Sequence, residues 1–528
     1  KMVVVVGANA SKWRNKEKAF FKVGQLTLEA GRGVSSLGDF ANDGTMEIGR
    51  FINRRSGFTN RHQMTLKHWE QRGAVFKNEL GGIIDVFDSS EVEADTIDND
   101  GDINWEGTLR GRIRQFLNQG GVTVKGDAKL TGTRLANSKN FKALGIFDWF
   151  GETLENTNTG KMTLFDNRVI ATRQVINEGL LLWTHNTFKT WHFLNMGWAE
   201  MTQDLTAVMP TTFKAPTDRS RVFKKSMVEN RGVLKLAPKD YTPRMTIERG
   251  GDFAHWLNQG DMILPDTHLR AQSFRNEGDI VVEGNLTGFV ETFENIKKMV
   301  TTGSFDLKGK SLTNSGSLKG KKGVAYNGEA ITTTDGSELT AQEAVVLTAT
   351  TPLTLRGKVQ SKQGMTLTAP QIENRAKLTV RTGKAIMGGD FKNYGHFNVD
   401  EWVYEGAEFL NEGVLEANTY HRTTPFRRLV NGAGKTLIIR RGGFTAQQIQ
   451  SRGKLELSNG VYRFESWDNK DGTADIDQLC LALLNPLLHG KLDANVLLPF
   501  ASPYDSLTIM GETVFRKDGF VTKKLTTR

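Results

Sequence analysis

Apolar and polar residues alternate along this chain in short runs, and the runs return about every 19 residues. The first clear run contains Phe40, Asn42, Gly44, Met46 and Ile48, with apolar residues at alternate positions around an Asn-x-Gly pair. Alternation with a period of two is typical of a strand, and each strand here is only about three to five residues long. The pattern therefore predicts many short strands separated by tight turns.

The same motif recurs through most of the chain: an apolar residue, any residue, Asn, any residue and Gly. Successive copies are mostly about 18 to 21 residues apart, which is too regular for chance. The asparagines assigned to the repeat are Asn42, Asn99, Asn118, Asn158, Asn177, Asn195, Asn230, Asn258, Asn276, Asn314, Asn393 and Asn411. At Asn158 the Asn-x-Gly pair is kept, but Asn156 occupies the apolar position. Degenerate copies, such as those at Asn60, Asn137 and Ser451, fill the gaps.

A repeat of this length predicts an all-β fold, a parallel β-helix (solenoid) with ~19-residue coils stacked ~4.8 Å apart. A single coil cannot bury its apolar side, so stacking supplies the core. The repeats from Asn42 to Ser451 would form roughly 21 coils. Gly is expected to supply a positive φ at the turn, and the stacked Asn amides are expected to form a hydrogen-bonded ladder. The alternative is that Asn-x-Gly is ordinary turn chemistry with no ladder.

The regularity of the repeat sets the expected domain organisation. The repeats extend over residues 37–457, and residues 1–36 and 458–528 are expected to be caps or junctions. Residues 198–256 hold extra proline-containing segments, which predict loop insertions, and residues 315–371 lose the Asn register. Within the C-terminal segment, Asp475–Leu488 is interpreted as a short helix.

The repeat resembles the haemagglutinin repeats of filamentous haemagglutinin and of CdiA-type exoproteins. The resemblance covers roughly residues 37–457 and is clearest at Val359-x-Ser361-x-x-Gly364-Met365-Thr-Leu367-Thr-Ala369. It implies a right-handed β-helix in a protein secreted with an outer-membrane transporter partner (two-partner secretion) and held at the bacterial cell surface. It further implies an adhesin, or a stalk that carries a C-terminal effector in contact-dependent inhibition. A receptor or glycan on a host or neighbouring cell would be the partner, and neither a cofactor nor an enzymatic activity is implied.

Composition adds limits to this picture. The chain has 528 residues and a net charge of +10, a weak basic bias at this length, so nucleic acid is not an expected partner. Cys480 is the one cysteine, which excludes an intramolecular disulfide. The apolar runs are far shorter than the ~20 residues of a membrane-spanning helix. Because the chain begins at a lysine, it is expected to be a piece of a longer protein.

Two groups of residues suggest binding chemistry. Asp98, Asp100 and Asp102 form a weak calcium candidate, because hard cations prefer clustered oxygens, but the bidentate glutamate of a calcium loop is missing, since Leu109 stands in its place, and a solvated acidic face is the favoured interpretation. Trp183, Trp191 and Trp198 are candidates for glycan contact, since flat rings on a β-helix face can stack on sugars. The alternative for these tryptophans is packing in the core or beneath an insertion.

Two other function classes stay open. The first is a β-helical polysaccharide-binding or polysaccharide-cleaving protein that uses the acidic face over Asp85–Asp102. The second is a subunit of a filament or secretion apparatus, in which the stack continues end to end between copies. Nucleophile-elbow, phosphate-loop and zinc-protease motifs are absent from the sequence, so we expect no catalytic residues.

Overall fold

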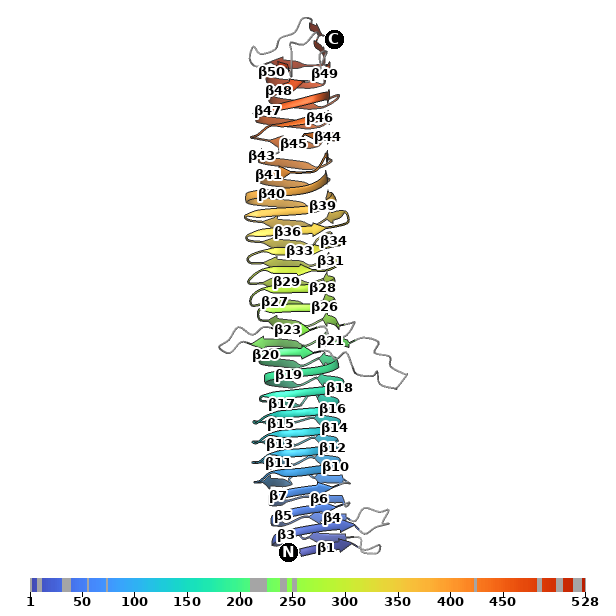
Figure 1. The fold of residues 1–528 in the computed structure, drawn as a ribbon, viewed down its shortest axis with the longest axis vertical. Coiled ribbons are helices and arrows are strands. Elements are labelled where there is room, and N and C mark those ends of the chain that lie inside the picture. The colour runs from blue at the N-terminus through green and yellow to red at the C-terminus, as the bar shows by residue number, and fades with distance from the viewer. Residues whose placement is uncertain are drawn as a thin grey trace, which may run out of the picture. The chain divides into compact units, whose positions relative to one another are not determined.

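A computed structural model describes most of the chain. The described residues are 2–6, 12–30, 39–54, 57–72, 75–208, 226–237, 245–248, 254–421, 425–481, 487–499, 507–515 and 525–527. They divide into two compact units, unit 1 over residues 1–280 and unit 2 over residues 281–528. Within each unit the strands are stacked one above another (Figure 1).

All regular elements in the described ranges are β-strands. In unit 1 they are β1 (Met2–Val6), β2 (Lys12–Asn15), β3 (Phe20–Ala30), β4 (Asp39–Asn42), β5 (Thr45–Arg54), β6 (Gly57–Asn60), β7 (Gln63–Arg72), β8 (Val75–Asn78), β9 (Ile83–Val86), β10 (Ser90–Asn99), β11 (Asp102–Trp105), β12 (Leu109–Asn118), β13 (Gly121–Val124), β14 (Ala128–Asn137), β15 (Asn140–Ala143), β16 (Phe147–Asn156), β17 (Lys161–Leu164), β18 (Asn167–Asn177), β19 (Leu180–Asn195), β20 (Trp198–Val208), β21 (Ser226–Asn230), β22 (Val233–Ala237), β23 (Met245–Glu248), β24 (Ala254–Asn258), β25 (Asp261–Leu264) and β26 (Thr267–Asn276), while β27 (Asp279–Val282) lies at the limit between the units.

The strands of unit 2 range from 3 residues in the shortest to 17 in the longest, so the prediction of strands of only three to five residues is wrong for the long ones, which continue through a bend of the coil. They are β28 (Leu286–Asn295), β29 (Lys298–Thr301), β30 (Phe305–Lys308), β31 (Ser311–Asn314), β32 (Ser317–Gly320), β33 (Val324–Gly328), β34 (Ala330–Thr333), β35 (Glu338–Ala341), β36 (Ala344–Ala349), β37 (Leu353–Leu355), β38 (Lys358–Ser361), β39 (Gly364–Asn374), β40 (Lys377–Asn393), β41 (His396–Tyr404), β42 (Glu408–Asn411), β43 (Val414–His421), β44 (Phe426–Asn431), β45 (Thr436–Ile439), β46 (Phe444–Ser451), β47 (Lys454–Asp468), β48 (Thr473–Leu481), β49 (Leu487–His489), β50 (Lys491–Pro499), β51 (Leu507–Met510), β52 (Thr513–Phe515) and β53 (Leu525–Thr527).

Each strand pairs in parallel with the equivalent strand of the next coil. Ile103 of β11 pairs with Val122 of β13, which in turn pairs with Phe141 of β15. This is the arrangement that a ~19-residue repeat requires, because residues one repeat apart become direct neighbours. The predicted fold class, an all-β parallel β-solenoid, is confirmed. No helix long and apolar enough to cross a membrane occurs among the described residues.

The core consists of columns of apolar side chains, each contributed by one residue per coil. The residue two positions before each repeat asparagine is buried, as in Phe58, Phe76 and Phe116. Phe58 and Phe76 stack with ring centroids 5.5 Å apart, and Trp69 and Trp105 form a second stacked pair at 5.7 Å. Such aromatic contacts stabilise neighbouring coils beyond the area that they bury.

The segments outside the regular repeat also contain stacked strands. Before residue 37, β1 pairs with β3 and β3 with β5, so the described part of this segment already follows the solenoid register. The prediction of a short helix over Asp475–Leu488 is wrong for the residues of this segment that the structure describes. Strand β48 occupies Thr473–Leu481 and pairs with β47, because stacking on the preceding coil outweighs local helix propensity.

Candidate functional site

In most coils one turn carries an asparagine whose side chain points into the solenoid. In unit 1 each of these amides donates from Nδ2 to Oδ1 of the asparagine in the next coil. Twelve such bonds, all 2.7–2.8 Å long, join Asn15, Asn42, Asn60, Asn78, Asn99, Asn118, Asn137, Asn156, Asn177, Asn195, Asn230, Asn258 and Asn276. We call this row the asparagine ladder. Its amides also donate to backbone carbonyls, so these buried polar groups have partners.

The ladder position in one coil differs from the sequence prediction. Asn156, which is 1% exposed, accepts from Asn137 and donates to Asn177, both at 2.8 Å. Asn158 lies exposed in the following turn and is not part of the ladder. The reason is packing: Leu154, two residues before Asn156, fills the buried apolar column. Leu154-x-Asn156 therefore carried a usable signal, although its glycine comes four residues later instead of two.

The ladder in unit 2 is interrupted. Asn295 donates to Asn314 at 2.8 Å, and Asn374, Asn393, Asn411, Asn431 and Ser451 form a second run of bonds. Between these runs Thr333 and Leu355 hold the equivalent positions, since β34 pairs with β37 and β37 with β39. Thr333 instead exchanges hydrogen bonds with the backbone of Arg356. In residues 315–371, where the Asn register is lost, the strands therefore stay stacked, but the row of hydrogen bonds between side-chain amides is interrupted.

The glycine of the motif has a different role from the expected one. None of the motif glycines is among the described residues with positive φ. A Cβ atom at Gly120 would lie 1.9 Å from the carbonyl oxygen of Gly101, and one at Gly413 would lie 2.1 Å from that of Gly395. Glycine is therefore required because the backbones of adjacent coils approach closely at this turn, not because the turn is left-handed.

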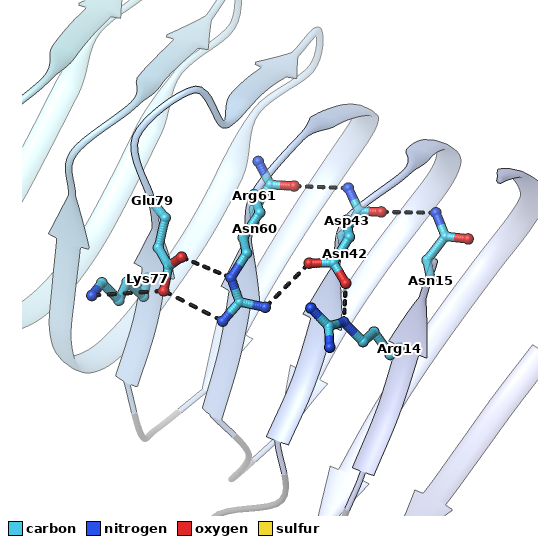
Figure 2. Close-up of polar contacts among 8 residues, drawn as sticks. All are labelled: Arg14, Asn15, Asn42, Asp43, Asn60, Arg61, Lys77 and Glu79. Carbon is cyan, nitrogen blue, oxygen red and sulfur yellow. Dashed lines mark hydrogen bonds and ion pairs between the residues drawn. The ribbon is translucent and has the colours of Figure 1, made fainter. Parts of the chain in front are cut away.

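Charged side chains flank the ladder at the first coils of unit 1 (Figure 2). Asp43 accepts from Arg14 and from Nη1 of Arg61 at 3.2 Å. Arg61 continues the row by donating from Nε to Oε2 of Glu79 at 2.7 Å, and Lys77 lies 3.8 Å from the same carboxylate. The hydrogen bond from Arg14, together with that from Arg61, holds the pKa of Asp43 below its ordinary value. The row therefore joins four coils at the surface, next to the buried amides.

The candidate calcium residues are not gathered around one point. Asp98 is partly buried beside the ladder, whereas Asp102 is exposed on the next strand. The part of the chain that the structure describes contains no group of three or more His, Cys, Asp or Glu side chains placed to hold a metal ion. Burial, and secondarily the charge of Asp100, raises the pKa of Asp98, while Lys77 opposes this shift. The Oδ1 atom of Asp98 is buried without a hydrogen-bond partner.

Replacing Asp98 by asparagine should raise the stability of the protein at neutral pH by up to about 1 kcal/mol. A carboxyl whose pKa is raised on folding favours the folded state fully below its unfolded pKa, and this contribution is lost as pH rises through the folded pKa. The gain from Asp98→Asn should therefore vanish below about pH 4. Denaturant unfolding at several pH values measures it, with the exposed Asp102→Asn as control. If the variant were still more stable than the unchanged protein at low pH, the gain in stability could not come from removing the charge of Asp98.

The three candidate tryptophans lie in different environments. Trp183 is 1% exposed and packs in the core, so a sugar cannot reach its ring, and the glycan-contact prediction is wrong for this residue. Trp198 is 43% exposed at the start of β20 and pairs with Leu180 and Val233 on the outer face. The side chain of Trp191 lies outside the described part of the structure. Of the two tryptophans described, only Trp198 can meet a ligand.

Comparison with known proteins gives one matching family. Its model, described as haemagglutinin repeat, matches residues 88–164, 300–357 and 345–386, so both units contain matched coils. The chain is also similar to a protein of Dickeya dadantii (strain 3937) named deoxyribonuclease CdiA, at 30% identity over 132 residues. The match covers 25% of this chain and only 4% of that protein. No solved structure matches the chain significantly.

Proposed function

Because the chain is a haemagglutinin-repeat protein of the filamentous haemagglutinin and CdiA type, we propose that it is a stalk segment of a secreted bacterial surface exoprotein. Its role is to hold binding loops, or an effector that follows it, at a distance from the cell. The observation that carries this proposal is the presence of family-matched coils in both units, built on one continuous stacking pattern in each.

The asparagine ladder suits this role because it links each coil to the next inside the stack. Twelve ladder steps at ~4.8 Å each extend unit 1 by roughly 60 Å. The hydrogen bonds between buried side-chain amides and the stacked aromatic rings connect successive coils, as the backbone pairing also does. Such a stack lengthens by adding coils without any change in its cross-section, which is what a spacer requires.

Insertions offer a place for partner contact. The ladder passes directly from Asn195 to Asn230 and from Asn230 to Asn258, at 2.7 and 2.8 Å. The register of the ladder is therefore continuous across both sequence insertions. Residues 209–225, 238–244 and 249–253 themselves lie outside the described residues. We propose that residues 198–256 present the contact surface for a receptor or glycan on a host or neighbouring cell.

Export would require an outer-membrane transporter as partner. A chain with one cysteine forms no intramolecular disulfide that would block threading through a pore. In this proposal the repeats are structural and adhesive. Any enzymatic effect on a target cell would come from another part of the whole protein.

Surface display is tested with an epitope tag inserted next to Asn158, because this exposed turn carries no ladder bond. The tag is placed in the complete natural protein in its own host. Antibody should label intact cells, and labelling should disappear when the partner transporter is deleted. A tag that is detected only after the cells are permeabilised would contradict the proposal.

A further inference from the structure

Unit 1 has a surface groove where its long strands bend. The groove lies over the bends of β10, β12, β14 and β16 and has a volume of about 680 Å³. We call it the bend groove, and its lining residues are Glu93, Ala94, Asp95, Arg112, Arg114, Thr131, Gly132, Thr133, Phe150, Gly151 and Glu152. It is separate from the asparagine ladder and from the insertions.

The groove is hollow because its floor lacks large side chains. Ala94, Ile113, Gly132 and Gly151 lie between two outward-facing rows of residues, and the Ile113 side chain is fully buried, so it does not enter the groove. A Cβ atom at Gly132 would be 1.8 Å from the carbonyl oxygen of Ile113, and one at Gly151 would be 2.3 Å from the Trp149 ring. The close packing beneath these glycines therefore keeps the floor free of side chains.

Each coil contributes one pair of side chains to the walls, and the chemistry changes from coil to coil. Register places Glu93 beside Arg112, Arg112 beside Thr131, and Thr131 beside Phe150. Asp95, Arg114, Thr133 and Glu152 form the opposite wall. The groove thus presents carboxylates, then guanidinium groups, then hydroxyls, and finally an aromatic ring with a carboxylate. With coils ~4.8 Å apart, these four rows span roughly 14 Å.

The walls offer both hydrogen-bond acceptors and donors with nearly balanced charge. Three carboxylates and two guanidinium groups line the groove. Arg114 and Asp95 lie 3.6 Å apart and are both largely exposed, so this pair is weak and can be displaced by a ligand. A polyanion such as nucleic acid or a sulfated glycan would meet repulsion from the carboxylates. A neutral chain rich in hydroxyls can bond to every row.

Phe150 supplies the apolar component. Its ring is 53% exposed on the outer face of β16, although most large apolar side chains of this unit are buried. A sugar ring has one apolar face that can cover such a ring, while its hydroxyls reach the neighbouring Thr131 and Glu152. An extended peptide is less well suited, since it carries fewer hydroxyl groups and would leave more of these rows without a partner.

From these features we propose that the bend groove binds a neutral oligosaccharide of about three sugar rings, aligned with the coil stack, one end of which packs on Phe150. The ligand is held by hydrogen bonds to the carboxylate, guanidinium and hydroxyl rows. This binding site does not depend on export or on the stalk role, so it can fail or succeed independently of both.

The test is a titration of the 528-residue chain with cellotriose, maltotriose and chitotriose, in which saturation-transfer NMR detects the bound sugar. At least one trisaccharide should bind, and its affinity should change little between low and high salt. Phe150→Ala should weaken that binding by about 5- to 10-fold. The matched control is Phe87→Ala, because Phe87 is also 53% exposed and does not line the groove, and this variant should bind as the unchanged protein does.

Circular dichroism of both variants confirms that the β-solenoid is intact. The proposal is overturned if none of the three sugars binds, or if the two phenylalanine variants behave alike. A heparin hexasaccharide and an alternating Lys-Glu peptide serve as counter-probes. Tighter binding of either one, lost at high salt, would also overturn it by assigning the groove to a charged ligand.

Discussion

Replacing Asn156 by leucine should lower the free energy of unfolding by about 3–5 kcal/mol. The change removes the hydrogen bond accepted from Asn137 and the bonds donated to Asn177, Gly160 and Leu180. These partners are interior groups that leucine cannot satisfy, and each unsatisfied buried group costs about 1–3 kcal/mol. Denaturant unfolding followed by far-ultraviolet circular dichroism measures the loss.

The control is Asn158→Leu, two residues away in the same coil. This side chain is exposed, so the substitution should change stability by no more than about 0.5 kcal/mol. Because stacked repeats need not unfold as one unit, hydrogen exchange at the amides of β16 and β18 should localise the effect. Equal losses for the two variants would show that Asn156 is not held by the ladder.

Replacing Gly120 by alanine should have the second-largest effect, a loss of about 3 kcal/mol. The added Cβ would lie 1.9 Å from the carbonyl oxygen of Gly101, and neither backbone segment can move without its neighbour. Strands β11 and β13 would have to separate, which weakens the 2.8 Å bond from the Gly121 N–H to that same carbonyl. Thermal and denaturant unfolding both report the change.

Gly24→Ala is the matched control for this substitution. No atom lies within 4 Å of a Cβ at Gly24, and its φ is not in the left-handed region. The variant should be neutral or slightly more stable, because alanine restricts the unfolded chain. If Gly120→Ala were equally neutral, close approach between coils could not explain the glycine of the motif.

The sequence predicts the fold well because each coil repeats the same local solution. The spacing from Asn99 to Asn118 directly specifies which residues become neighbours, and the structure places them 2.7 Å apart through their amides. Period-two alternation also places side chains correctly where it is applied strictly. Leu181 and Trp183 share one side of β19 and are both buried, whereas Trp198 precedes the buried Ala199 and faces outward.

Other features depend on distances between coils, which a linear pattern does not contain. Asn156 keeps the apolar residue of the motif and Asn158 keeps its glycine, so the sequence offers two competing signals, and the burial of Leu154 in the core decides between them. The role of Gly120 becomes apparent only from the position of the Gly101 carbonyl in the preceding coil. Likewise, Glu93, Arg112, Thr131 and Phe150 are far apart in sequence and meet only through the parallel register.

The asparagine ladder of unit 1 is polar as well as continuous. Every amide from Asn42 to Asn258 donates toward the coil that follows and accepts from the coil that precedes it, as Asn118 does between Asn99 and Asn137. Each amide group carries a dipole of about 3.5 D, and dipoles that point the same way reinforce one another. The electrostatic character of the stack is therefore directional. If one coil were added with its amide reversed, its Nδ2 group would face the Nδ2 group of one neighbouring coil, and its Oδ1 atom would face the Oδ1 atom of the other. The ladder therefore favours one orientation for every coil that joins it.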